Sequence, residues 1–400
     1  MRVPRWLWMV LLIGGAGCLL VTQVGCPPSQ PEPTVVGTSP TLTGETAETP
    51  EAPAPGEEPD EAAPKEQPKE AAADEKPEAA AAAPKEAAAA GTPYTVKVPL
   101  GLPELKIPAD NPMTEEKIAL GKKLYFDKRL SRDGTVSCAT CHDPKLAWTE
   151  HKPTSEGIKG QFGNMNSPTV INSAYAEVQF WDGRAATLEE QAVGPMENPV
   201  EMGHTLSELV TELGTLPEYK EAFQQVFGTG PTQDGLAKAI AAFERTILSG
   251  NSPYDKFEAG DKAALNDAQK RGMELFESSG CADCHAQPMF SNYRFYNAGI
   301  GMDKEKPDEG RKAVTGKDSD LGKFRVAPLR EVANTWPYFH DGSVEKLEDA
   351  VKIMAQGGKP NDNLSPMMKA VGDKKLTEEN IKDLVEFLKA LSGEYPVVEG

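Results

Sequence analysis

Two pentapeptides of one pattern constrain this 400-residue chain most: Cys138-Ala-Thr-Cys141-His142 and Cys281-Ala-Asp-Cys284-His285. Cys-X-X-Cys-His is the attachment pattern of c-type haem, in which two thiols bond to the porphyrin vinyl groups and the adjacent imidazole binds the iron. A single match can arise by chance, but these two matches use every cysteine beyond residue 26. The sequence therefore predicts two covalently bound haem c groups.

Two other uses of paired cysteines fit the pattern less well. Zinc sites commonly contain Cys-X-X-Cys pairs, but zinc requires neither a histidine directly after the second cysteine nor two copies of one pentapeptide. A thioredoxin-like redox pair needs alternating strands and helices around it, and neither motif has that setting. Covalent haem is therefore the favoured interpretation.

The first 26 residues have the form of an export signal. Arg2 and Arg5 form a short basic region, and an apolar run extends from Trp6 to about Val21. Covalent haem attachment takes place outside the cytoplasmic membrane, so we expect an exported, periplasmic protein. Simple cleavage would release a soluble protein, whereas a retained helix or a lipid on Cys26 would tether it to the membrane. The long segment that follows favours the tether.

That segment, residues 27–93, is dominated by Pro, Ala and Glu. It contains four lysines and 14 acidic residues, a net charge of −10. So few large apolar side chains cannot bury enough surface to offset the entropy of ordering the chain. We therefore predict a disordered spacer that holds the rest of the protein away from a membrane.

The remaining residues have a globular composition and a net charge of −11. About 300 residues suffice for two modest cores, and we predict one haem c domain over 94–260 and a second over 261–400. Nucleic acid is not an expected partner of so acidic a body. A small electron donor with a basic docking face would fit it.

Helical patterns dominate this body, and strand signals are scarce. We expect helices over 115–129, after a capping box at Thr187, from a second capping box at Thr205 towards Phe227, and over 233–249, 266–279, 345–355 and 378–391. Pro- and Gly-rich loops around 152–204 and 286–342 would wrap the haems. The predicted fold is mainly α, with two c-type cytochrome domains packed together after the spacer.

A series of further motifs resembles the bacterial di-haem cytochrome c peroxidase family. These motifs follow the family's order and span essentially all of 100–396: Leu120–Ser131, Ser137–His142, Asn166–Val170, Gln179–Ala185, Glu190–Pro195, Asn198–Met202, Ala327–Arg330 and Pro337–His340. The resemblance implies reduction of hydrogen peroxide with electrons from a small cytochrome c or cupredoxin. It also makes a homodimer one candidate assembly. Methylamine-utilisation enzymes that mature a tryptophan-derived quinone share this scaffold.

In that family the N-terminal haem is the peroxidatic one and the C-terminal haem relays electrons to it. The resemblance therefore implies that His142 binds the catalytic iron and His285 the relay iron. Met354 occupies the position of the relay iron's sixth ligand, where a thioether raises the reduction potential. Met367 and Met368 are rival candidates, and an ordinary core methionine is the alternative reading of Met354. The quinone-maturing enzymes have a tyrosine there, so Met354 favours a peroxidase.

Three further residues match the family's catalytic positions. Heterolytic cleavage of the O–O bond moves a proton from the inner to the outer oxygen, which requires a carboxylate beside the open face of the iron. Glu201 and Gln191 match the glutamate and glutamine that the family places there, and partial burial would raise the pKa of Glu201. Trp181 matches a tryptophan that carries electrons between the haems. Without the resemblance, Glu201 would be read as a solvated loop residue and Trp181 as structural.

The resemblance also implies a calcium site between the domains. Asn166 and the main-chain carbonyls of Thr335 and Pro337 match its ligands, and oxygen ligands suit a hard cation. Three loop residues alone are weak support for such a site. His340 matches a family residue near the second haem and is expected to act beside it, not as a ligand.

The chain departs from the family at one important position. Many members close the catalytic iron at rest with a distal histidine, and that residue is replaced here by Ile158. Isoleucine cannot bind iron, so we hypothesise a five-coordinate or water-bound catalytic haem at rest. His151 is the nearby substitute, although we expect it to be a surface loop residue. We also expect His204 to be exposed.

Two functions of other classes are weighed against the peroxidase. A di-haem electron carrier would have two six-coordinate irons and would not need Glu201, Gln191 or Trp181. An enzyme that oxidises a partner protein would carry a tyrosine in place of Met354. Peroxide turnover with a reduced donor protein separates these functions from a peroxidase.

Overall fold

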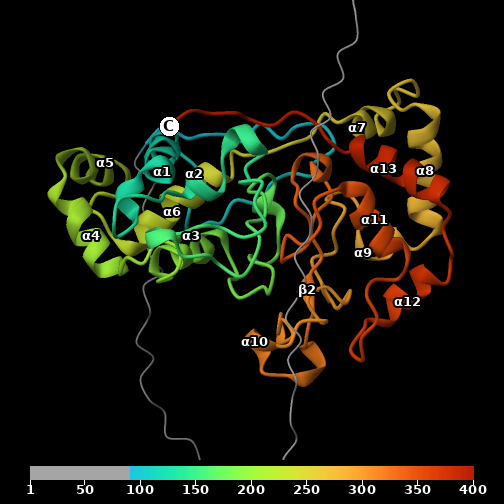
Figure 1. The fold of residues 1–400 in the computed structure, drawn as a ribbon. Helices are drawn as coiled ribbons and strands as arrows, with labels where there is room; N and C mark the ends of the chain where they lie inside the picture. Colours follow the sequence, from blue (N-terminus) through green and yellow to red (C-terminus); the bar gives the residue numbers. More distant parts are fainter. Residues whose placement is uncertain (1–90) are drawn as a thin grey trace, which may run out of the picture. The chain divides into compact units, whose positions relative to one another are not determined.

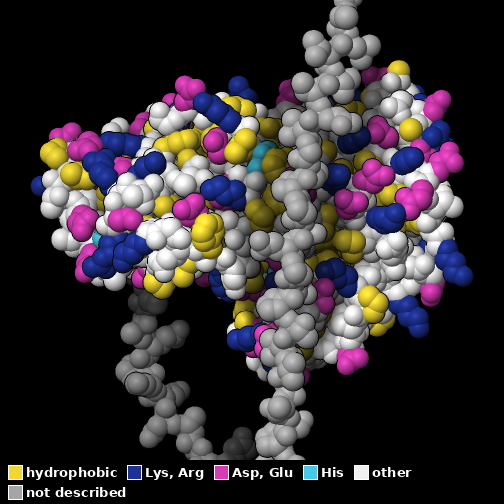
Figure 2. Space-filling model, in the orientation of Figure 1, with side chains coloured by type: hydrophobic (Ala, Val, Ile, Leu, Met, Phe, Trp, Pro, Cys, Tyr) yellow, Lys and Arg dark blue, Asp and Glu magenta, His cyan; other side chains and the backbone are white. Residues whose placement is uncertain are grey.

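The computed structural model describes residues 91–400, drawn in colour in Figure 1. The predicted export signal, Cys26 and the spacer up to residue 90 lie outside the described residues. Within 91–400, no helix is both long enough and apolar enough to cross a membrane. On the face drawn in Figure 2, acidic and basic side chains are interspersed and do not form one patch of a single sign.

The described residues are mainly helical, as the sequence predicts. The first half contains α1 (Glu115–Phe126), α2 (Cys138–Cys141), α3 (Leu188–Glu197), α4 (Leu206–Thr215), α5 (Pro217–Phe227) and α6 (Gln233–Glu244). The second half contains α7 (Pro253–Glu258), α8 (Asp267–Ser278), α9 (Cys281–Cys284), α10 (Lys312–Thr315), α11 (Leu347–Ala355), α12 (Pro366–Gly372) and α13 (Glu378–Lys389). Two short strands, β1 (Phe295–Tyr296) and β2 (Phe324–Arg325), pair antiparallel with Phe295 opposite Arg325.

Each half is built around the same crossing of two helices. In the first half α1 packs on α6, and a Cβ atom at Gly121 would overlap the carbonyl oxygen of Ala239. In the second half α8 packs on α13, and a Cβ atom at Gly272 would overlap the carbonyl oxygen of Asp383. Only glycine lets the two helix backbones approach so closely. Because Gly121 meets Ala239 and Gly272 meets Asp383, the two crossings can be aligned on these contacts, and residues 239–244 then correspond to 383–388.

Two separate hydrophobic cores support these crossings. The first includes Leu124 and Trp148, which are fully buried, and the second includes Phe276 and Phe387, whose ring centroids lie 5.3 Å apart. The chain returns to the first core at its end, where the Trp148 indole N–H donates to the Pro396 carbonyl at 2.9 Å. The C-terminus accordingly lies beside α1 (Figure 1). The prediction of two cytochrome c-type domains is confirmed, while the boundary at 260/261 stays a prediction.

Some helix boundaries differ from the predicted ones. The prediction of one helix from Thr205 towards Phe227 is wrong, because the chain breaks between α4 and α5 at Leu216, whose ψ is 115° where a proline follows. The Thr205 side chain also makes no capping hydrogen bond. Helix α6 ends at Glu244 and not at 249, and the Ser249 backbone beyond it pairs with the buried Asn172 side chain. Helices α7, α10 and α12 were not predicted from the sequence.

Candidate functional site: one cavity lined by both cysteine-histidine motifs

A single cavity of about 1230 Å³ contains the predicted functional residues of both halves. This volume exceeds the ~300–1,000 Å³ of an ordinary small-molecule pocket. Its wall includes Cys138, Cys141, His142, Cys281, Cys284, His285, Gln191, Glu201, Trp181, Met354, Asn166, Thr335 and Pro337. The structure therefore brings every predicted site residue to one cavity, although their individual roles stay predictions.

Each Cys-X-X-Cys segment forms one helical turn, α2 or α9, with the histidine as its C-cap. The His142 amide donates to the Cys138 carbonyl at 3.0 Å, and the His285 amide donates to the Cys281 carbonyl at the same distance. All four cysteines are free thiols, and burial raises the pKa of Cys141 to about 12. One turn of helix thus holds two neutral thiols and one imidazole against the same cavity, as covalent haem attachment requires.

The two imidazoles are neutral but differ in how they are held. Burial lowers the pKa of His142 to about 4 and lowers the pKa of His285 as well. Neutral imidazole is the form that binds a metal. His285 Nδ1 lies 3.0 Å from the Phe290 carbonyl oxygen, which orients the ring and leaves Nε2 for a ligand, whereas His142 Nδ1 is buried without a hydrogen-bond partner.

A buried cation on the cavity wall suits the carboxylates that each haem carries. The Arg325 side chain is buried and its Nε donates to the Phe180 carbonyl at 3.1 Å, but its Nη1 has no hydrogen-bond partner. Among the described residues no carboxylate pairs with Arg325. A buried charge without a counter-ion costs several kcal/mol. The cavity wall, with its four thiols, two imidazoles and this guanidinium, therefore fits two haem c groups.

Glu201 occupies a half-buried turn that follows α3. Burial raises the pKa of its carboxyl, and Arg184 and the Asn198 side chain offset this only in part. Asn198 Nδ2 donates to Glu201 Oε1 at 2.7 Å, and the Ile158 amide donates to the Glu201 carbonyl at 2.9 Å. The turn is fixed at both its side chain and its backbone. Gln191 reaches the same cavity from the first turns of α3, behind the Thr187 cap.

Ile158, the residue predicted to stand in place of a closing histidine, does not face the cavity. Ile158 is buried in the first core and is absent from the cavity wall. His151 is absent from the wall as well; it stacks on Trp336 with ring centroids 4.3 Å apart, and its Nε2 lies 3.0 Å from the Asn334 carbonyl oxygen. The histidines of residues 91–400 that do line the cavity are His142, His285 and His340.

The expectation that His204 is exposed is wrong. Its side chain is only 4% exposed, and its Nε2 lies 3.2 Å from Glu212 Oε2 in α4. The His204 amide donates to the Met196 carbonyl at 2.7 Å, so the chain folds back onto α3 before α4 begins. This contact between separate segments buries a residue that sequence alone places on the surface.

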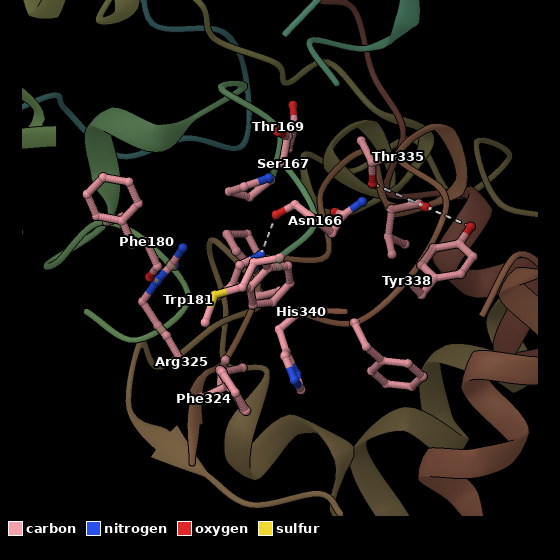
Figure 3. A pocket seen from close by; sticks show the side chains of 18 of the residues that line it. Asn166, Ser167, Thr169, Phe180, Trp181, Phe324, Arg325, Thr335, Tyr338 and His340 are labelled. Carbon is pink, nitrogen blue, oxygen red and sulfur yellow. Dashed lines mark hydrogen bonds between the residues drawn. The ribbon is translucent and has the colours of Figure 1, made fainter. Parts of the chain in front are cut away.

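Trp181 joins segments of the two halves (Figure 3). Its indole N–H donates to the Asn166 carbonyl at 2.8 Å, and its own carbonyl accepts from the Arg325 amide at 2.8 Å. The Asn166 amide in turn donates to the His340 carbonyl at 2.7 Å. An aromatic ring is thus fixed between a first-half loop and strand β2.

Two other predictions concern residues of the second half. His340 forms part of the cavity wall. Its Nε2 lies 2.8 Å from Asp308 Oδ2, and its ring stacks on Phe324. Met354, near the end of α11, reaches the cavity, as do Met367 and Met368. Arg325 and Asp308 were not predicted, because no local sequence pattern marks residues whose partners come from distant segments.

Comparisons with known proteins agree with this site. Residues 115–263 match the family model described as di-haem cytochrome c peroxidase, and residues 269–392 match the cytochrome c model. The cytochrome c551 peroxidase of Pseudomonas aeruginosa is 42% identical over 300 residues, which cover 72% of this chain and 82% of that protein. The chain belongs to the di-haem cytochrome c peroxidase family.

Proteins named for a different function are also similar to the chain. The methylamine utilization protein MauG of Methylophilus methylotrophus is 35% identical over 290 residues, covering 72% of this chain and 85% of that one. The crystal structure of a MauG-like protein associated with microbial copper homeostasis matches with a TM-score of 0.69 and 31% identity, over 75% of this chain and 96% of that chain. Family membership fixes the fold and the two c-type haems.

Proposed function

We propose that this cytochrome-c peroxidase reduces hydrogen peroxide to water at the first haem, with electrons that a small cytochrome c or cupredoxin delivers to the second. The observation that carries the proposal is the chemical asymmetry of the cavity wall. The first half contributes the Glu201 carboxyl and the Gln191 amide, and the second half contributes the Met354 thioether. One peroxide, two electrons and two protons give two waters.

Glu201 is the proposed proton carrier. When bound, the haems supply an iron that takes up peroxide and a second iron that passes electrons. The Asn198 side chain holds Oε1 of Glu201 at 2.7 Å. The other carboxyl oxygen can then accept the proton of the inner peroxide oxygen and return it to the outer oxygen, which leaves as water. Gln191 would orient the peroxide, and Trp181 would carry electrons between the halves.

We further propose that the first haem is open at rest. Two observations support this proposal: Ile158 lies in the core, and the His151 ring is held by Trp336 and Asn334. No reductive activation would then be needed. Met354 is the proposed sixth ligand of the second haem because it matches the family position of that ligand. Met367 and Met368 line the same cavity from helix α12, so helical rigidity alone does not separate the three methionines.

The remaining proposals concern location and a metal ion. The export signal and the haem motifs together support a periplasmic enzyme, with a tether through the N-terminus and a homodimer as further predictions. Asn166, Thr335 and Pro337 line the cavity together, which supports the proposed calcium site.

Replacement of Glu201 by glutamine tests the proposed function. Peroxide consumption with a reduced small cytochrome c should fall about 10²- to 10⁴-fold in Glu201→Gln, because the proton carrier is removed. Glu197→Gln is the matched control, since Glu197 is exposed at the end of α3 and makes no hydrogen bond through its side chain. Unchanged turnover in Glu201→Gln would refute its role. A native protein with both haems loaded that consumes no peroxide would instead be an electron carrier.

A further inference from the structure

A second buried carboxyl lines the cavity beside the first haem motif. Glu244 lies in the last turn of α6 and is only 4% exposed. Its Oε2 is buried and has no hydrogen-bond partner, and its side chain forms part of the cavity wall with Ile240 and Cys138. The proposed peroxide chemistry does not use this group. Burial of a carboxyl without a partner is costly, so its presence requires an explanation.

The second half has a leucine at the position equivalent to Glu244. The two helix crossings at Gly121 and Gly272 make Ile240 equivalent to Leu384 and Glu244 equivalent to Leu388. Leu384 and Leu388 line the cavity beside the second motif. An apolar side chain therefore satisfies this position in the same architecture, and the carboxyl distinguishes the first haem from the second.

The charged and titratable groups around Glu244 leave it without a counter-ion. On its own helix, Arg245 is engaged with Glu189 of α3 through contacts of 2.8 and 3.1 Å. From α1 it is faced by the Tyr125 hydroxyl, and from α2 by the Cys138 thiol, which haem attachment would convert to a thioether. Burial raises the pKa of Glu244 to about 8, with Glu189 adding to the increase and Arg245 opposing it.

We propose that Glu244 couples the oxidation state of the first haem to the release and uptake of a proton. When this haem gives up an electron, to the second haem or to a redox mediator, the added positive charge favours the carboxylate. The proton then passes from Glu244 to water, and reduction reverses both transfers. The first haem would thus be harder to reduce as pH rises, while the second haem, beside Leu388, would not. This inference rests on haem attachment and is independent of peroxide turnover.

Potentiometric titration of the haem-loaded protein, followed by the absorbance of each haem from about pH 6 to about pH 10, tests the coupling. The redox equilibrium constant of the native first haem should fall by up to tenfold per pH unit, which is 59 mV for one electron. This slope should be lost in Glu244→Leu, which copies Leu388, and in the nearly isosteric Glu244→Gln. Glu221→Gln, at an exposed position of α5, should keep it.

The second haem is the internal reference, because titration of haem carboxylates would affect both haems. Only the excess slope of the first haem is assigned to Glu244. The same slope in native protein and Glu244→Gln would overturn the inference, as would equal slopes of the two native haems. Peroxide turnover is measured on the same samples. Loss of turnover with the slope retained in native protein would count against the proposed function alone.

Discussion

The two halves of this protein share a scaffold and differ where the scaffold meets the cavity. The first half crosses α1 and α6 at Gly121, and the second crosses α8 and α13 at Gly272, each with a phenylalanine, Phe243 or Phe387, packed in the core. The cavity wall of the first half carries Glu244, whereas the second half has Leu388 at that position. The two halves thus repeat the scaffold that carries each haem motif, and we propose that a few residues of the cavity wall give the two haems different roles.

The halves also differ in how completely each buries an arginine–carboxylate pair. Arg330 and Asp255 in the second half are 2% and 1% exposed, with contacts of 2.8 and 2.9 Å. Arg245 and Glu189 in the first half are 5% and 18% exposed. A fully enclosed pair leaves a stranded charge when one partner is neutralised, while a partly exposed pair admits water. Neutralising one partner of the pair should therefore destabilise the protein more in the second half than in the first.

The largest expected effect on stability comes from breaking these pairs. Asp255→Asn should lower the free energy of unfolding by about 3–5 kcal/mol, because Arg330 would be left buried without its counter-ion. Glu189→Gln should cost less, about 1–3 kcal/mol, because Glu189 is partly hydrated. Urea unfolding of each haem-loaded variant measures both values. A larger loss in Glu189→Gln would contradict the comparison.

A smaller and equal effect should follow from adding one methyl group at each helix crossing. Gly121→Ala and Gly272→Ala should each lower the free energy of unfolding by about 1–3 kcal/mol or more, since the new Cβ meets a backbone carbonyl oxygen that cannot move aside. Gly214→Ala in α4 is the control, because nothing lies within 4 Å of its Cβ position. That variant should gain up to about 1 kcal/mol. Tolerance at only one crossing would show that the halves are not built alike.

The sequence predicted local features well, because their causes are local. The Thr187 side chain caps α3 with a contact of 3.1 Å to the Glu190 amide, as its capping box indicates, and α8 follows Asn266, where the sequence predicts a helix. The two cysteine motifs likewise specify their own helical turns. Pro217 is the local mark of the break between α4 and α5, because a proline restricts the residue before it to extended backbone.

The features that the sequence did not reveal depend on segments that meet only in the folded chain. Arg325 reaches Phe180 across 145 residues, and the buried position of His204 follows from its backbone contact with Met196. The burial of the Glu244 carboxyl likewise comes from the packing of α6 on α1, which are more than 100 residues apart in the chain. Such residues have no short pattern around them, so residue spacing cannot mark them.

The smallest expected effect is a pH limb that belongs to the first half alone. Burial raises the pKa of Glu201, so its ionised form is lost as pH falls through a value above the ordinary 4.5. If ionised Glu201 accepts the peroxide proton, kcat/KM for peroxide should fall with pH in that window, and the limb should be absent from the residual activity of Glu201→Gln. Reduction of the second haem by the donor should show no such limb. An unchanged limb in the variant would assign it to another group.

The resting spin state of the fully oxidised protein tests the central asymmetry most directly. Electron paramagnetic resonance should show a high-spin signal from the first haem, for which we propose no distal protein ligand, and a low-spin signal from the second, which Met354 and His285 would ligate. Addition of a small anionic ligand should convert only the high-spin signal. Two purely low-spin signals in the untreated protein would contradict the account and would bring His151 forward as a ligand of the first haem.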